Sequence, residues 1–517
     1  MKIRSRATAA VSTAAAAILL VSACGGASTS PAAAQSGEPQ RGGTLAYSYN
    51  TESQSIDPAT CAIGIGVGPC QAVYGALLYY NADTAEIEPG MAESFTTEDG
   101  KTWTLKLRPG LTFTDGTPFD AAAVDFNWKR ILDPALLSPS ASAAKTIDWE
   151  VVDPTTIVVT AKNVNHQLDF DLTEALAYIA SPKAIQEKGP DFGNNPVGAG
   201  PFVLASWARG TEMTLDRNPS YWDQPRPYVD QLVIKTIPAD DQRFNALQAG
   251  EVDVMAVTVQ KYAERAENAG MNVTHATLLG GTGMRLSHRG ALADQDVRTA
   301  IGKLVDNDQI MSAVYPGEPV ASGFTPEDSS LYDAGSAWPE RDVEGAQQLI
   351  DDYRARTGSG EIELTYVITA GSPVLNQTAE LIQSQLQQVD GLRVRITPLE
   401  GAAFATALTT GDYDLIVSAL GGAHPDNLYK VFRTGGSSNN SGYSNPVVDE
   451  ALDLTRTSND PQVVQDAYKT AINELVDTTA YRFWRHARTD LISPANVQGV
   501  EAAYQYWFRP ELAWIGR

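Results

Sequence analysis

Basic residues are scarce in this 517-residue chain, and their scarcity excludes one large class of partners. Lys and Arg together number 38 against 62 Asp and Glu, which gives a formal net charge of -24 at pH 7. A surface this acidic repels phosphate backbones and does not supply the basic patch that nucleic-acid binding needs. We therefore expect no nucleic-acid partner.

The sequence also lacks the residue patterns of common enzyme classes. Its five histidines show none of the close pairings that zinc hydrolases use. We find no Gly-x-Ser-x-Gly elbow and no Walker-type lysine loop. We therefore predict that the protein is not an enzyme and needs no metal or cofactor. Glycosidases use two carboxylates that face each other across a cleft. This arrangement leaves no such sequence pattern, so the sequence does not exclude a glycosidase.

The sequence lacks long apolar runs, and the apolar run near its N-terminus is short. Residues 1–23 carry three basic residues, no acidic residue and an apolar stretch, which is typical of a signal peptide and too short for a mature membrane span. The sequence Val-Ser-Ala-Cys that ends at Cys24 resembles the bacterial lipobox, in which the cysteine is diacylated. An ordinary cleaved signal with a chance cysteine is the alternative. We expect an exported protein, lipid-anchored to the outer face of the cytoplasmic membrane.

Residues 24–42 are rich in Gly, Ser, Ala and Pro and have no apolar periodicity. Such a composition predicts a flexible tether between the lipidated cysteine and the folded body.

Cysteine is rare, with three in the whole chain. Apart from Cys24, only Cys61 and Cys70 remain. An even pair in an oxidising compartment predicts a disulfide rather than a catalytic thiol. The bond would close the Gly-rich loop CAIGIGVGPC.

Strand-like and helix-like segments alternate along the rest of the chain. Residues 43–50 alternate apolar and polar side chains as a half-buried strand does, and residues 120–132 fit a helix that Asp120 caps. The segments EIELTYVIT, SPVLNQTAELIQSQLQQVDG and LRVRITPL predict a strand, a helix and a strand, as in a crossover unit of an open α/β sheet. The chain is too long for one core, so we expect two or three substructures, and the alternation favours mixed α/β or α+β lobes.

The segment at residues 86–130 carries the most specific resemblance to a known family. It contains Ala-Glu-Ser, an Asp-Gly turn, a Thr- and Trp-containing strand ending in Leu-Arg, and Asp-Gly-x-Pro-Phe before a helix. Their order and spacing resemble the bacterial extracellular solute-binding proteins of family 5, which include dipeptide, oligopeptide and nickel binders. Further matching segments are GGTLAYSYNTESQSIDP, VGAGPFVLASW, RNPSYW, ALQAGEVDV, ADQDVRTAIGKLVDNDQI, GDYDLIVS and YSNPVVDEAL.

The resemblance implies an α/β fold of the type II periplasmic-binding-protein class, in the large cluster that has an extra subdomain. Two unequal lobes would close over a ligand in the cleft between them. Carried onto this chain, the first lobe with the extra subdomain takes residues 43–280 and the second lobe takes residues 281–489. Residues 490–517 return to the first lobe.

The function that the resemblance implies is capture of a solute outside the membrane for the permease of an ABC importer. The expected ligand is a dipeptide or oligopeptide, and a metal chelate, a siderophore or an oligosaccharide is the alternative. Only the residues that line the cleft distinguish these ligands, because the fold serves all of them. The protein is expected to be a monomer.

Two segments match the regions where peptide-binding relatives contact the ligand backbone. The first contributes Asn50 and Glu52. The second contributes the stretch from Gly421 through Gly422 and Ala423 to His424. These glycines would also serve simply to make a turn.

The second segment departs from the family pattern at the position that matters for a peptide. Relatives commonly have Gly-Trp-x-Ala-Asp there, and the aspartate pairs with the ammonium group of the ligand. By this resemblance that position holds His424 in this chain, with Asp426 two residues later. The expected ammonium partners are therefore Asp426 and Glu52. Aromatic candidates for the flanks of the ligand are Tyr49, Tyr429, Phe483 and Trp484.

Overall fold

The computed structural model describes residues 37–61, 66–81, 84, 86–422, 424–504 and 506–516. The predicted signal peptide, Cys24, the tether up to residue 36 and Ala423 lie outside these residues. Residues 39–517 form one compact unit, which is the subject of the following description. Within the described part of the chain, no helix is long and apolar enough to cross a membrane.

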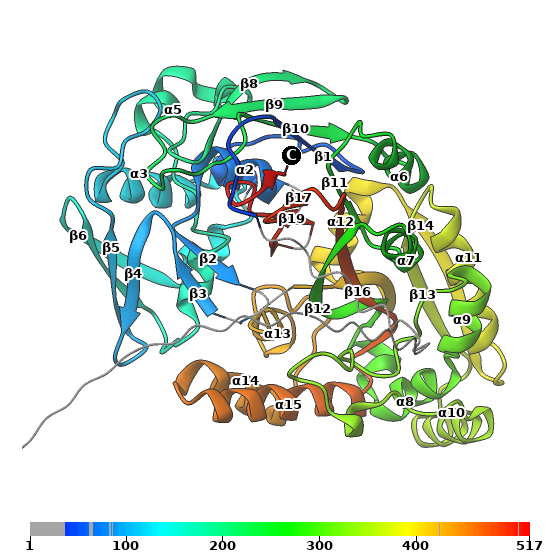
Figure 1. Ribbon diagram of the computed structural model, residues 1–517. Coiled ribbons are helices and arrows are strands. Elements are labelled where there is room, and N and C mark those ends of the chain that lie inside the picture. Colours follow the sequence, from blue (N-terminus) through cyan, green and yellow to red (C-terminus); the bar gives the residue numbers. More distant parts are fainter. Residues whose placement is uncertain are drawn as a thin grey trace, which may run out of the picture. The chain divides into compact units, whose positions relative to one another are not determined.

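A mixed sheet of ten strands organises this unit, in the order β14-β13-β15-β12-β16-β11-β1-β10-β9-β8 (Figure 1). The strands are β1 (Thr44–Tyr49), β8 (Phe202–Ala208), β9 (Glu212–Arg217), β10 (Gln231–Thr236), β11 (Val254–Val257), β12 (Asn272–Leu286), β13 (Ile362–Thr369), β14 (Leu392–Leu399), β15 (Leu415–Leu420) and β16 (Tyr481–Ser493). The predicted first strand is thus confirmed, at the middle of one half of the sheet.

The helices lie on the faces of this sheet and in the segments around it. They are α1 (Pro58–Cys61), α2 (Val67–Tyr74), α3 (Ala121–Ile131), α4 (Ala141–Ala144), α5 (Pro182–Lys188), α6 (Asp240–Gln248), α7 (Gln260–Asn268), α8 (Gln295–Leu304), α9 (Asn307–Val314), α10 (Val343–Thr357), α11 (Pro373–Leu386), α12 (Gly401–Thr410), α13 (Asn427–Phe432), α14 (Pro446–Thr457) and α15 (Pro461–Asp477). A 3-10 helix, η3 (Leu168–Leu172), contributes residues to the wall of the candidate site.

The two longest strands, β12 and β16, pair antiparallel and join the two halves of the sheet. At one end β16 pairs with β11, and at the other end β12 pairs with β15. Two glycines of β12 permit the close approach. A Cβ at Gly281 would lie 2.1 Å from the carbonyl oxygen of Arg485, and a Cβ at Gly283 would lie 2.1 Å from that of Arg482. Only glycine fits at these two positions.

A second, four-stranded antiparallel sheet stands beside the first, in the order β4-β5-β7-β6. Its strands are β4 (Ala92–Thr97), β5 (Thr102–Leu107), β6 (Ile147–Asp153) and β7 (Thr156–Ala161). Helix α3 packs near it through Trp128, which is fully buried. The Asp120 side chain accepts a hydrogen bond from the backbone of Ala123, so the predicted helix cap is confirmed. Three small two-stranded sheets complete the strands: β2 (Leu78–Asn81) with β3 (Glu86–Pro89), β17 (Val497–Gln498) with β20 (Trp514–Ile515), and β18 (Ala502–Tyr504) with β19 (Trp507–Phe508).

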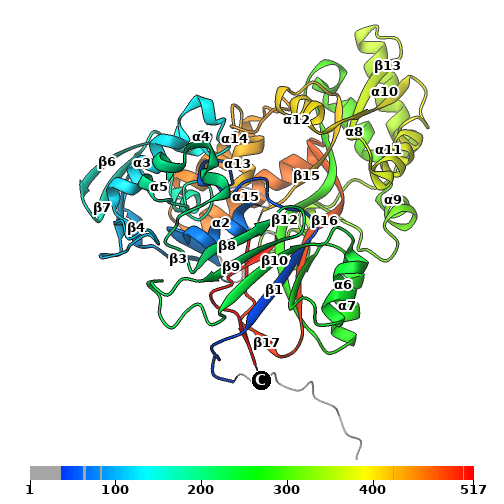
Figure 2. The ribbon, with the colours of Figure 1, turned by 90° about the horizontal axis from the view of Figure 1, so that it is seen from above.

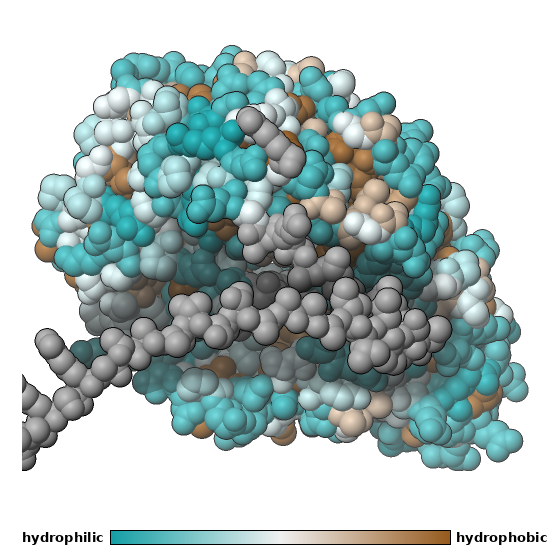
Figure 3. Space-filling view, viewed as in Figure 1, coloured by the Kyte–Doolittle hydropathy of each residue, from teal (hydrophilic) through white to brown (hydrophobic). Residues whose placement is uncertain are grey.

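The predicted crossover unit is confirmed on the other side of the molecule. Strands β13 and β14 pair in parallel along their full length, and α11 connects them. In Figure 2 the four-stranded sheet lies at the left and β13 with α10 and α11 at the right, while β12 and β16 lie between. The face seen in Figure 3 is mainly hydrophilic, with apolar residues in small groups.

The hydrophobic cores divide into two sets. Three clusters draw their buried residues from residues 45–266 and 491–513, and three others draw theirs from residues 279–484. Among the described residues, no cluster mixes the two sets. The chain therefore has the two-lobe α/β fold that was predicted. The exact lobe limits remain our proposal, which this division of the cores supports.

Helices α1 and α2 are tied together by the Cys61–Cys70 disulfide, as predicted. Cys70 is fully buried in the core of the first lobe, where the bond anchors both helices against β1 and the C-terminal strands.

Candidate functional site

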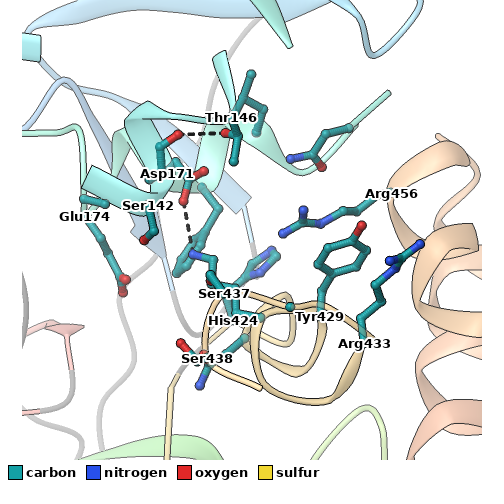
Figure 4. A pocket seen from close by; sticks show the side chains of 18 of the residues that line it. Ser142, Thr146, Asp171, Glu174, His424, Tyr429, Arg433, Ser437, Ser438 and Arg456 are labelled. Carbon is teal, nitrogen blue, oxygen red and sulfur yellow. Dashed lines mark hydrogen bonds and ion pairs between the residues drawn. The ribbon is translucent and has the colours of Figure 1, made fainter. Parts of the chain in front are cut away.

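A cavity of about 560 Å³ lies between segments that belong to the two sets of cores (Figure 4). One wall comes from residues 139–175 and the other from residues 421–456. We call it the first cavity. Its volume falls in the range of about 300 to 1,000 Å³ that small-ligand sites occupy.

A second cavity, of about 860 Å³, also has walls from both lobes. Tyr80, His166 and Gln167 line it from the first lobe, and Asp328 and Tyr468 are among the residues that line it from the second. His424 lines both cavities. The two spaces therefore share one wall residue, which sequence analysis had placed at the ligand.

The backbone after β15 brings three of the predicted residues together. Gly421, Gly422 and His424 all line the first cavity. The carbonyl oxygen of Gly422 accepts a hydrogen bond from the backbone nitrogen of Leu279 at 2.9 Å, which ties this segment to β12. Neither glycine has a side chain that would cover the backbone, so a ligand can approach the main chain closely.

The two lobes touch directly at the edge of the first cavity. The backbone nitrogen of His166 donates to the carbonyl oxygen of Arg456 at 2.7 Å. Lys430 forms an ion pair with Asp171 at 3.1 Å. The ring of Phe170 stacks on His424 with their centroids 4.2 Å apart. These contacts hold η3 of the first lobe against α13 and α14 of the second.

Charged groups of both signs line the first cavity from different sides. Figure 4 shows Asp171 and Glu174 on one side and Arg433 and Arg456 on the other. Burial raises the pKa of Glu174 to about 7, against the opposing charge of Lys430. The carboxyl group of Glu174 therefore changes its charge near neutral pH.

Asp426, a predicted ammonium partner, is already neutralised within the second lobe. Its two carboxylate oxygens accept hydrogen bonds from the guanidinium group of Arg456 at 2.8 and 2.7 Å. The side chain of Asp426 is only 3% exposed. The same guanidinium group lies over the ring of Tyr429, 3.5 Å from its centroid. Tyr429 lines the first cavity, as its prediction as a ligand contact requires.

Glu52, the other predicted ammonium partner, is not among the residues that line either cavity. It accepts hydrogen bonds from the indole nitrogen of Trp207 at 2.6 Å and from the backbone nitrogen of Gly210 at 3.0 Å. It lines a separate small pocket of the first lobe together with Tyr49. Asn50 is exposed beside this pocket. The structure therefore does not bring the two predicted segments together around one space.

Trp484 and Phe483 are fully buried, and each belongs to a hydrophobic core of the second lobe. Although they are neighbours on β16, their side chains pack into two different hydrophobic cores. Both faces are covered at this position. The structure thus places these two aromatic residues in the protein interior, where neither offers surface to a ligand, and we leave both out of the proposed site.

Several lining residues were missed by sequence analysis. Phe170, Asp171 and Glu174 come from η3 and the turns after it, in a stretch that carries no motif. The only available signal was a local density of acidic side chains, which usually marks a solvated surface. Among the described residues, no group of His, Cys, Asp and Glu has the arrangement of a metal site.

We predict that Asp426 acts mainly on stability. Asp426→Asn should lower the free energy of unfolding by about 3 to 5 kcal/mol, because it leaves the Arg456 guanidinium buried without its partner. Arg456→Met should have a similar cost for the converse reason, and the double variant should recover part of the loss. Urea unfolding of the three variants measures this. A stable Asp426→Asn protein that loses its ligand would instead make Asp426 a direct ligand contact.

Comparisons with known proteins place the chain in a family. The model of the bacterial extracellular solute-binding proteins, family 5 Middle, matches residues 86–442. Protein XP55 of Streptomyces lividans is 27% identical over 476 residues, which cover 88% of this chain and 86% of XP55. Two solved structures share the fold at 23% identity, each covering 92% of this chain and 99% of its own. One is DppA from Helicobacter pylori in complex with the peptide STSA, with a TM-score of 0.77. The other is AgaA from A. tumefaciens R10 in complex with agropinic acid, with a TM-score of 0.78. The chain therefore belongs to the bacterial extracellular solute-binding proteins of family 5.

Proposed function

We propose that this protein captures short peptides between its lobes and delivers them to the permease of an ABC importer. The observation that carries the proposal is the first cavity, which has walls from both lobes and charged groups of both signs. The family consists of solute-binding components of transporters rather than enzymes.

A free peptide matches the charges of this cavity. It carries an ammonium group at one end and a carboxylate at the other, and burying either ion without a partner would cost several kcal/mol. Among the described residues Glu174 has no ion pair and offers negative charge on one side of the space, and on the other side lies Arg433, whose guanidinium group also pairs with Asp453 (Figure 4). The bare backbone at Gly421 and Gly422 suits hydrogen bonds to a peptide main chain, which do not depend on its sequence.

Binding between two lobes also supplies the signal to the permease. A ligand that contacts both walls favours the closed arrangement over the open one by its additional contacts. Strands β12 and β16 cross between the lobes and would bend when the lobes separate. The loaded and empty forms would then present different surfaces to a membrane partner.

A non-peptide solute is the second candidate. The segment from Gly421 to Asp426 lacks the tryptophan of peptide-binding relatives and has His424 where they have the aspartate, and Asp426 is already paired with Arg456. AgaA, which shares the fold, was solved with agropinic acid. A metal chelate, a siderophore or an oligosaccharide would use the same cleft with other contacts.

We also propose that the protein acts at the outer face of the cytoplasmic membrane as a monomer, held by acylated Cys24 and the tether at residues 24–42. The lipobox-like sequence before Cys24 supports this anchor.

Calorimetric titration with a mixed pool of tri- to hexapeptides tests the peptide proposal. The soluble Cys24→Ser form should bind the pool at pH 8, and Glu174→Gln should weaken binding by about ten- to hundredfold, because a charge-assisted hydrogen bond is lost. Wild-type affinity should fall at pH 6, since Glu174 takes up a proton below its pKa of about 7.

Glu52→Gln is the matched control, because it removes a carboxylate that lines neither cavity, and it should change affinity less than about threefold. Titrations without heat for the whole pool would favour the non-peptide solute. A loss with Glu52→Gln but not with Glu174→Gln would put the ligand elsewhere.

The anchor has its own test. Cys24→Ser should move the protein from the membrane fraction into the medium, because the acyl chains that hold it are no longer attached. Immunoblots of the two fractions measure this. A variant that stays with the membranes would show that another feature anchors the protein.

A further inference from the structure

The imidazole ring of His424 is held in a fixed orientation at the junction of the two cavities. Phe170 stacks on one face at 4.2 Å between centroids, with an interplanar angle of 17°. Tyr80 packs its ring edge to face against the imidazole at 5.4 Å. Both partners come from the first lobe, on η3 and β2. The ring therefore has little freedom to rotate while the lobes are together.

One hydrogen bond determines which ring nitrogen carries the proton. The backbone nitrogen of Asp426 lies 3.1 Å from Nδ1 of His424. A backbone N–H can only donate, so Nδ1 must accept with its lone pair. A neutral imidazole carries one proton, which must then be on Nε2.

The ring is neutral at physiological pH. Burial lowers the pKa of His424 to about 4. Of the surrounding charges, Asp426 and Asp171 favour protonation of the ring while Lys430 and Arg456 oppose it, and these four groups form two ion pairs. His424 thus presents a neutral Nε2–H donor and no acceptor of its own.

Among the described residues, Nε2 of His424 has no hydrogen-bond partner, although the residue lines both cavities. We infer that the ligand places an acceptor oxygen, from a carboxylate or a carbonyl group, against Nε2–H of His424. An ammonium group cannot take this place, because it has only donors and would face another donor. This inference rests on the proposed function for the position of the ligand.

The inference fixes which end of a bound peptide lies near His424. The Nε2–H donor of His424 selects an oxygen rather than an ammonium group. The ammonium group of a peptide would then lie toward Glu174 and Asp171, on the side of the cavity formed by the first lobe (Figure 4). The segment from Gly421 to Asp426 would contact the carboxylate or an internal carbonyl group instead.

The tautomer can be tested without any ligand. Long-range proton–nitrogen correlation spectra of the ¹⁵N-labelled Cys24→Ser protein report the state of each histidine ring, and His424→Phe identifies the signal. We expect the Nε2–H tautomer, uncharged from pH 7 down to about pH 5. A proton on Nδ1, or an imidazolium ring at pH 7, would overturn the inference.

The acceptor is tested with the peptide pool. His424→Phe keeps an aromatic ring against Phe170 but removes the donor, and it should weaken binding about tenfold. His424→Asp should weaken it further, because an acid would face the acceptor oxygen. Glu52→Gln is again the control, since Glu52 lines neither cavity, and it should change affinity less than about threefold. Unchanged or tighter binding by His424→Asp would show that the site takes an ammonium group.

Peptides with amidated C-termini distinguish the two acceptors. If the carboxylate faces His424, amidation weakens binding to wild type much more than to His424→Phe. If an internal carbonyl group does, amidation affects both proteins equally. A wild-type protein that binds no peptide contradicts the peptide function, whereas the ring spectra still support or overturn the inference about His424.

Discussion

The antiparallel pairing of β12 and β16 is the constraint on which the rest of this structure depends. These two strands run from the half of the sheet that contains β11 and β1 to the half that contains β15 and β13. Gly281 and Gly283 allow their backbones to approach where any side chain would collide. Because one strand pair belongs to both halves, each lobe can keep its own core while their relative position changes by bending at this pair.

Several charged side chains are partly buried because they lie where the two lobes meet. Lys430 and Asp171 pair across the lobe boundary, and Arg456 and Asp426 pair within the second lobe. Each pair satisfies charges that would otherwise be expensive to remove from water. Glu174 lies near Lys430 without an ion pair to any described residue, which fits its raised pKa and makes it the carboxyl group most available to a ligand.

Much of the fold could be predicted from sequence, because its signals are local. The strand at Thr44–Tyr49, the helix capped by Asp120 and the unit of β13, α11 and β14 each follow from periodicity and capping residues within a short window. The Cys61–Cys70 disulfide followed from the small number of cysteines.

The site was predicted only in part, because its walls come from segments far apart in the chain. Gly421, Gly422 and His424 follow a recognisable strand and line the first cavity. The opposite wall, with Phe170 and Glu174, carries no motif. Trp484 looked like a ligand contact because aromatic residues often are, but both faces of β16 are buried, and alternation along a strand does not reveal this.

The central claim is that the ligand is held between the lobes, and a crystal structure of the protein with the solute that copurifies from its own host tests it most directly. We predict density that contacts both the segment from Gly421 to His424 and the segment that contains Phe170 and Glu174, with an oxygen atom within hydrogen-bond distance of Nε2 of His424. Density that touches one lobe alone, or lies outside both cavities, would contradict the account.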